Sequence, residues 1–356
     1  MIRDKKYRYT LTYQKDMEPA AAENEDNVPT YVVINYIAIA AHLITAVAQM
    51  ILYWPKDPSE FPYTESYLKW AKVKNGTICQ GFTFNTTNDG KFCVQPEMDR
   101  ICNEDESGLR CGVDLGWLII SFFLLSFFFQ LIAALTDFWS NGVCGYKYSE
   151  KIEQGLNPLR FLEYSISASV MLVAIAVLNG VFDINLVASI AVLTCSCQLS
   201  GLVVEYLLQY DKDDLALLAH LNGWLTLACA YGIIFHAYFK SATEGDTQPP
   251  GFVTLIVASL CALYCCFGIT QITELFCRCR CSFVTEEDKK QIITQKKCKD
   301  FCNARCESCC SLRCRNTNEG RCDHACKELS YVILSLAAKS VLGWVIFSNV
   351  LIAPRS

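Results

Sequence analysis

Charged residues are scarce in this chain. Only 19% of its 356 residues are Asp, Glu, Lys or Arg, against about 25% in a typical soluble domain. The net charge of −5 is modest, and it includes no basic excess of the kind that binds nucleic acid. This composition argues against two or three soluble domains and favours one integral membrane domain.

The pattern of a cleavable signal peptide is also missing. Residues 1–29 are polar and charged, and the first apolar run begins near Tyr31, so we expect no such peptide. Because that run is long enough to cross a bilayer, we expect it to act as both the targeting signal and the first helix.

Apolar residues are plentiful, at 52% of the chain with a mean hydropathy of +0.23. A membrane-spanning helix needs roughly 20 mostly apolar residues. The sequence therefore predicts an all-α membrane protein with seven transmembrane helices, multi-pass in the plasma membrane or another cellular membrane. The predicted spans are 31–54, 115–138, 159–181, 184–209, 214–239, 251–276 and 328–353.

The orientation of these spans follows from the lysines and arginines in their connections. The N-terminal tail holds five of them and the loop 277–326 holds eleven, whereas the short loops on the other side hold few. We therefore predict a cytoplasmic N-terminus. The predicted parts are a cytoplasmic tail at 1–30, six helices within 31–276, a cytoplasmic cysteine-rich loop at 277–327, and a last helix with an extracellular C-terminus at 328–356.

The first long loop, 55–113, is extracellular in this topology. The segment from Ile78 to Val94 alternates apolar and polar residues around Asn88-Asp89-Gly90, which predicts a small β-hairpin. Its cysteines can pair in an oxidising space, with three possible connectivities, and it carries two glycosylation sequons. The disulfide candidates are Cys79, Cys93, Cys102 and Cys111, and the glycosylation candidates are Asn75 and Asn85.

Lys339 is the sharpest functional candidate, because an ionisable residue inside a span is costly and is by default a sign of function. It lies near the middle of the last predicted span. A buried lysine loses its proton readily, which makes it a good nucleophile toward an aldehyde. The alternative is a lysine paired with a buried acid in a transporter.

Glu163 is the best candidate for an anion that would keep a Schiff base on Lys339 protonated. Arg160 precedes it by three residues, on the same helical face, so we expect Arg160 to help keep Glu163 ionised. The alternative is a structural Arg–Glu pair at the end of a helix.

Two motifs carry a resemblance to a known family. Glu163-Tyr-Ser-Ile-Ser-Ala-Ser169 resembles the third-helix signature of heliorhodopsins, and Ala338-Lys339-Ser340 followed by Leu342-Gly343-Trp344 resembles their retinal-binding helix. The resemblance extends over all seven helices in order. It implies all-trans-retinal bound through Lys339, Glu163 as its counterion, a homodimer, and light sensing as the function.

Several positions differ from those of microbial ion pumps. Pumps usually have an aspartate one turn before the retinal lysine, where this chain has Ser335, and polar or acidic residues at the positions of Ser167 and Ala174. We therefore expect no active pumping. His42 resembles a family histidine of a polar cluster beside the counterion, and Gln130 stands in place of its usual partner histidine.

A bound retinal needs an apolar, aromatic slot. Tyr264 and Phe267 in the sixth span and Trp224 in the fifth are candidate walls. The alternative for each is plain packing, since aromatic residues at helical spacing are common in helix cores.

The loop 277–326 is rich in cysteine as well as basic residues, and it suggests a cytoplasmic partner. Juxtamembrane cysteines among basic residues favour S-palmitoylation, and the basic excess favours anionic lipid. Zinc binding by residues such as Cys306, Cys309, His324 and Cys326 is a weaker alternative, because no paired CxxC spacing is clean. We assign no metal site.

Three functions remain open from the sequence, and none is that of an enzyme. The first is a retinal photosensor that is not a pump. The second is a light-gated passive proton channel that uses Glu205, an intramembrane acid near the cytoplasmic end of the fourth span. The third is a chromophore-free receptor, but the chain lacks an acidic-Arg-Tyr motif in its third span and an Asn-Pro-x-x-Tyr motif in its seventh.

Overall fold

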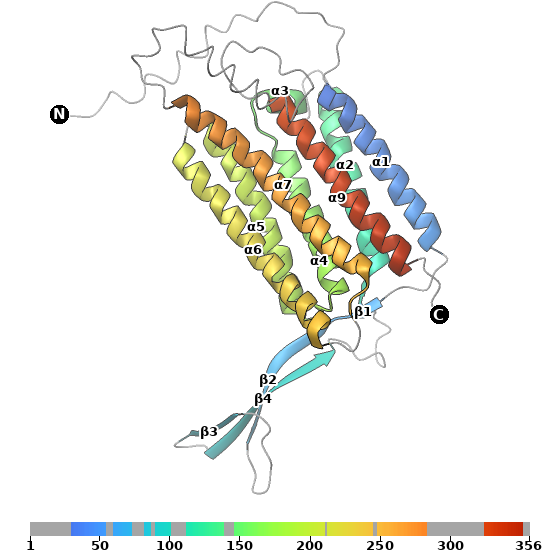
Figure 1. Cartoon of the computed structure of the whole chain (residues 1–356), viewed down its shortest axis with the longest axis vertical. Helices are drawn as coiled ribbons and strands as arrows, with labels where there is room; N and C mark the ends of the chain where they lie inside the picture. The colour runs from blue at the N-terminus through green and yellow to red at the C-terminus, as the bar shows by residue number, and fades with distance from the viewer. Residues whose placement is uncertain are drawn as a thin grey trace, which may run out of the picture.

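In a computed structural model, the chain forms a bundle of long helices with a small β-sheet attached at one end (Figure 1). The structure describes residues 30–54, 60–72, 82–86, 90–100, 112–138, 146–210, 212–244, 248–282 and 324–351. The N-terminal tail up to residue 29 and residues 283–323 of the cysteine-rich loop therefore lie outside the described residues, as do the predictions made for them.

Within the described residues, seven helices are long and apolar enough to cross a membrane. This confirms the predicted multi-pass integral membrane protein. The helices are α1 (Thr30–Tyr53), α2 (Leu115–Phe138), α4 (Pro158–Leu178), α5 (Ile184–Gln209), α6 (Asp213–Glu244), α7 (Gly251–Ser282) and α9 (His324–Ile346), and a short π-helix, η2 (Phe347–Leu351), continues α9.

The predicted ends are close to the observed ones, and the differences have local causes. α4 stops at Leu178 because Gly180 adopts a positive φ of 83°, a left-handed conformation that ends a helix. Asp183 then caps α5 by accepting from the backbone N–H of Asn185. α6 and α7 continue beyond the predicted spans, to Glu244 and Ser282, since polar residues can extend a helix past the apolar core of a bilayer.

α4 is the central helix of the bundle. In its most apolar window 78% of the residues are buried, against 28% to 50% in the other six spans. A polar side chain on α4 therefore faces other helices rather than lipid. A short helix that the sequence did not predict, α3 (Tyr148–Glu153), lies at one end of the bundle, here called the α3 end (Figure 1).

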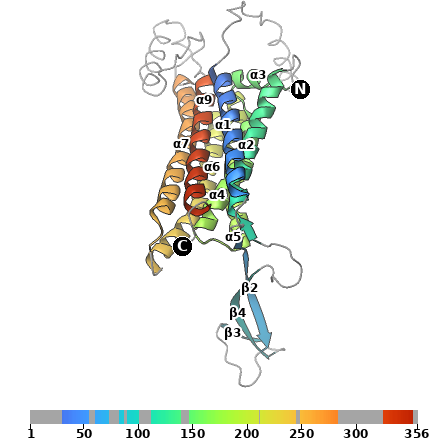
Figure 2. The ribbon, with the colours of Figure 1, turned by 90° about the vertical axis from the view of Figure 1, so that its right-hand side faces the viewer.

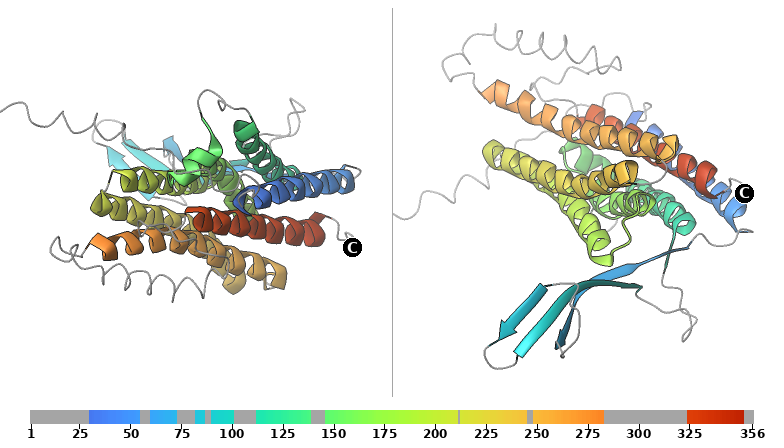
Figure 3. Two further views of the ribbon diagram at one scale, coloured as in Figure 1. Left: turned by 90° about the horizontal axis from the view of Figure 1, so that it is seen from above. Right: turned by 60° about the horizontal axis from the view of Figure 1, so that its bottom comes forward.

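The sheet lies beyond the opposite end, here called the sheet end (Figures 2 and 3). β3 (Phe82–Thr86) and β4 (Gly90–Arg100) pair antiparallel, with Thr86 opposite Gly90. This agrees with the predicted hairpin. The prediction missed β2 (Thr64–Lys72), which pairs with the other edge of β4, and the pair of β1 (Glu60–Pro62) with β5 (Gly112–Asp114).

Two hydrogen bonds attach β2 to the turn between α4 and α5. The backbone N–H of Thr64 donates to the carbonyl of Phe182 at 2.9 Å, and that of Ser66 donates to the Asp183 carboxylate at 3.1 Å. The bond from Ser66, followed by those from the backbone N–H groups of Asn185 and Leu186, holds the pKa of Asp183 below its usual range. The sheet is therefore fixed to the sheet end of the bundle.

The cysteines and sequons of the first loop are only partly described. Cys93, in β4, takes part in a disulfide bond. Asn85 lies in β3, and its side chain is not described. The other candidates, Asn75, Cys79, Cys102 and Cys111, lie outside the described residues.

Candidate functional site

Lys339 and Glu163 form a buried ion pair in the middle of the bundle. Lys339 Nζ lies 2.5 Å from Glu163 Oε1, and the two residues are only 2% and 4% exposed. Ser126 of α2 joins them, since it accepts a hydrogen bond from Lys339 and lies 2.6 Å from Glu163 Oε1. The sequence predicted the pair but missed Ser126.

The three side chains come from α2, α4 and α9, and their burial explains their contact. A charge taken out of water is costly unless an opposite charge and hydrogen bonds offset that cost. The ammonium group of Lys339 has both: a carboxylate and a hydroxyl. The pair therefore fixes the position of the amine at the centre of the bundle.

An aromatic cavity opens beside Lys339. The predicted residues Tyr264, Phe267 and Ser335 all line it, so the structure brings them to the amine. Its full lining is Tyr164, Ser167, Ala168, Met171, Gln198, Tyr264, Phe267, Ser335, Ala338 and Lys339. The Tyr264 hydroxyl donates to the carbonyl of Ala168 at 3.1 Å, which leaves mainly the ring of Tyr264 to face the cavity.

A second cavity adjoins the first and extends toward α6. Four residues line both cavities: Tyr164, Gln198, Tyr264 and Phe267. The second is lined in addition by Trp224 of α6, with His220, Gly268 and Gln271 close to it. Together the two cavities form a mostly apolar space that starts at Lys339 and is walled by Trp224.

His42 on α1 and Gln130 on α2 are both buried. His42 packs against Phe123, with ring centroids 5.9 Å apart. Within the part of the chain that the structure describes, neither ring nitrogen of His42 has a hydrogen-bond partner. The backbone carbonyl of Gln130 accepts a bond from Asn35 at 3.5 Å. In the described residues, His42 and Gln130 therefore form no hydrogen bond with each other.

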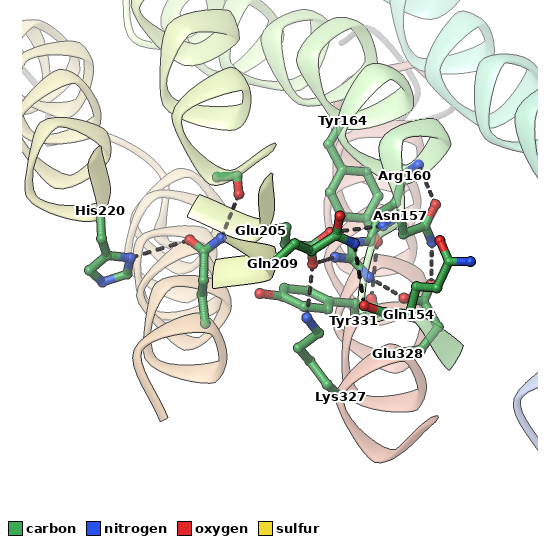
Figure 4. A network of polar contacts seen from close by, with 12 residues as sticks. Gln154, Asn157, Arg160, Tyr164, Glu205, Gln209, His220, Lys327, Glu328 and Tyr331 are labelled. Atoms are coloured by element: carbon green, nitrogen blue, oxygen red, sulfur yellow. Dashed lines mark hydrogen bonds and ion pairs between the residues drawn. The ribbon is translucent and has the colours of Figure 1, made fainter. Parts of the chain in front are cut away.

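Arg160 takes part in a second buried network, at the α3 end (Figure 4). Its guanidinium pairs with Glu205 of α5 and Glu328 of α9, and it lies 4.0 Å from the centre of the Tyr331 ring. The predicted support of Glu163 by Arg160 does not take the form of a direct ion pair in the described residues. The partners of Arg160 are acids of two other helices, which spacing along α4 could not reveal.

The network, here called the Arg160 network, closes around these two acids. Lys327 Nζ donates to Glu205 at 3.0 Å, and the Asn157 backbone N–H donates to the same carboxylate at 2.8 Å. Tyr148 of α3 and the Asn157 side chain donate to Glu328 at 3.0 and 2.8 Å. Two cations thus offset two anions. Glu205 is therefore buried and bonded to groups of neighbouring helices.

The heliorhodopsin family model matches residues 78–278, which is more than half of the 356-residue chain. The chain belongs to the heliorhodopsin family. A search of curated proteins finds no match. Heliorhodopsins are retinal-binding, light-sensing membrane proteins of the photoreceptor type rather than enzymes.

The matched range of this heliorhodopsin contains Glu163 and Glu205 but ends before Lys339. The contact between Glu163 and Lys339 joins the matched region to the last helix. A buried amine beside a carboxylate, at the mouth of an apolar aromatic cavity, fits the aldehyde and the polyene of retinal. The residues present therefore suit the group that the family binds.

Proposed function

We propose that this protein is a light sensor that holds all-trans-retinal on Lys339 as a protonated Schiff base and does not pump ions. The observation that carries this proposal is the buried Lys339–Glu163 pair beside the aromatic cavity. Retinal supplies the absorption of visible light and isomerises on illumination. The chain supplies the amine, the counter-charge and the shape of the slot.

Glu163 would act as the counterion. It is the carboxylate in contact with Lys339, and Ser126 fixes the position of its Oε1 atom. Tyr164, Tyr264 and Phe267 would enclose the polyene, and Trp224 would bound the part of the cavity far from Lys339.

Two buried hydroxyl residues support the absence of pumping. Ser335 and Ser167 both line the cavity, at positions where a pump usually has residues that exchange a proton with the chromophore. A serine hydroxyl does not ionise in the physiological range, so these residues offer the Schiff base no proton donor.

The alternative of a passive proton channel through Glu205 gains less support. Glu205 accepts from Arg160, Lys327 and the backbone of Asn157, and a carboxylate with these partners is poorly suited to bind and release protons. We therefore expect no photocurrent in patch-clamp recordings across varied pH gradients. Currents that reverse near the proton equilibrium potential and vanish in Glu205→Gln would establish the channel instead.

We further propose the orientation that the loop charges predict, with the N-terminus and the loop 277–327 in the cytoplasm and the sheet outside. A homodimer, implied by the family, and a cytoplasmic partner of the cysteine-rich loop belong to the same proposal. The proposal also includes the predicted division of the chain into a tail at 1–30, six helices within 31–276, a loop at 277–327 and a last helix at 328–356.

The direct test is the visible absorption spectrum after retinal is added to the purified protein in lipid. The wild-type protein should develop a visible band, and Lys339→Ala should develop none because the amine is gone. Lys327→Ala is the matched control, since it removes a different lysine of the same helix, one away from the cavity, and should keep the band. A wild-type band that persists in Lys339→Ala would overturn the assignment.

A further inference from the structure

Trp224 is held against the backbone of α7. A Cβ atom at Gly268 would lie 2.5 Å from Cζ2 of the indole, so a larger residue there would displace the ring. Trp224 also lines the second cavity. The position of the indole therefore depends on Gly268, whose missing side chain lets the backbone of α7 come this close.

A chain of hydrogen bonds holds the N–H group of the indole. Trp224 Nε1 donates to Nε2 of His220, one turn earlier on α6, at 2.8 Å. His220 Nδ1 lies 3.2 Å from Oε1 of Gln271 on α7, and Gln271 Nε2 donates to the carbonyl of Gly201 on α5 at 2.8 Å. Figure 4 shows His220 to one side of the Arg160 network, with the bonds that lead away from its ring but without Trp224.

The direction of every bond in this chain is fixed by its two ends. An indole N–H can only donate, and a backbone carbonyl can only accept. His220 must therefore accept at Nε2 and carry its proton on Nδ1, from which it donates to Gln271. His220 and Gln271 are both buried, where an unpaired polar group is costly. The structure thus specifies a neutral imidazole with one tautomer.

We propose that His220 is a positioning residue for the chromophore, and that it acts by holding the indole of Trp224 as a fixed wall of the second cavity. The chain of bonds connects this wall to α5 and α7, so the slot keeps its shape when α6 and α7 fluctuate. This inference rests on the proposed function, because the wall would contact the part of retinal far from Lys339. The sequence motifs did not indicate His220.

The first test needs no retinal. In the ¹⁵N NMR spectrum of histidine-labelled, retinal-free protein in lipid, His220 should give a neutral imidazole protonated on Nδ1. That signal should disappear in His220→Gln and change in Trp224→Phe, which lacks the N–H donor. His236→Gln is the matched control, since His236 is an exposed histidine of the same helix. An Nε2-protonated imidazole or an imidazolium at His220 would overturn the proposal.

The second test asks whether His220 acts through Trp224. With retinal bound, His220→Leu should shift the absorption band, whereas the same change in a Trp224→Phe background should give no further shift. His220→Gln, which can still accept from the indole, should recover part of the wild-type band position. Equal shifts in both backgrounds would contradict the positioning role.

The two tests separate failure of this inference from failure of the proposed function. If the wild-type protein gives no visible band with retinal, the proposed function is wrong and the chromophore role of His220 fails with it. The NMR result still decides whether His220 holds Trp224. If the band forms but the Nδ1-protonated imidazole is missing, the positioning role alone is wrong.

Discussion

The bundle contains two buried ionic clusters, and they are built differently. At Lys339, one cation and one anion lie beside a cavity, with few other polar partners. In the Arg160 network, two cations and two anions are enclosed by further donors from α3 and α4. Both clusters involve α4 and α9, and their acidic residues are buried to a similar degree.

The difference shows that buried charges can have two roles in one molecule: stabilising the fold and binding a ligand. Closed networks hold helices together, because each group already has its partners and a ligand could offer little more. The Lys339 pair holds fewer contacts and borders an open space, so a ligand can reach its amine. We infer that the Arg160 network stabilises the bundle and that the Lys339 pair carries the chemistry.

Arg160→Ala should have the largest effect on stability. It leaves Glu205 and Glu328 without their shared cation in a buried site, which costs about 3–5 kcal/mol. The measurement is thermal or denaturant unfolding in lipid or detergent, compared with the wild type. The absorption maximum of the fraction that folds with retinal should change little.

The matched control for Arg160→Ala is Lys240→Ala, because Lys240 forms an exposed pair with Glu244, and such pairs contribute about 0–1 kcal/mol. If both variants unfold alike, the Arg160 network is not the stabilising element. If Arg160→Ala shifts the absorption band strongly, the two clusters are not separate.

Glu163→Gln should show the opposite pattern to Arg160→Ala: a moderate loss of stability and a large change in the absorption spectrum. Removing the negative charge beside the protonated Schiff base destabilises its protonated form. The band should move to longer wavelength, or be lost at a lower pH than in the wild type during a titration. Glu205→Gln is the control and should leave the spectrum and the titration unchanged. Identical spectra for Glu163→Gln and the wild type would point to another counterion.

Tyr148→Phe should give the smallest effect and a defined pH dependence. Its hydroxyl donates to Glu328 at 3.0 Å, so its loss costs about 1 kcal/mol. Burial, and then the nearby Glu328 charge, raise the pKa of Tyr148 well above its usual range. The stabilisation is therefore complete below about pH 10 and is lost as pH rises through the higher pKa of the folded state.

Unfolding of the wild type and Tyr148→Phe as a function of pH measures this. The difference in stability between them should narrow above about pH 10. A constant difference up to higher pH would show that the tyrosine is not held in its protonated form by the fold.

The fold was largely readable from the sequence, because length and hydropathy alone decide which segments can span a bilayer. α2 and α5 begin and end at the predicted residues. α3 was missed because six residues are too few to show a helical period, and its place depends on Tyr148 reaching Glu328. β2 was missed because its pairing partner, β4, is the second strand of the hairpin and is separated from β2 in the sequence by β3.

The residues of the site could be predicted from the sequence only where a residue stood out from its own segment. Lys339 and Glu163 are conspicuous charges in apolar spans, and the structure brings them into contact. Ser126 and His220 are ordinary in sequence, and their roles depend on which helices meet. The ion-pair partners of Arg160 could not be predicted for the same reason: spacing on one helix gives the face of a side chain, but packing decides which acids of other helices it meets.

The attachment of β2 has a mechanical consequence. Thr64 and Ser66 are bonded to the turn that directly follows α4, and α4 carries Glu163. The three-stranded sheet projects from that turn well beyond the ends of the helices (Figure 1). A tilt of α4 would therefore displace the sheet's far tip more than the core of the bundle, and a probe attached at that tip would report on such a tilt.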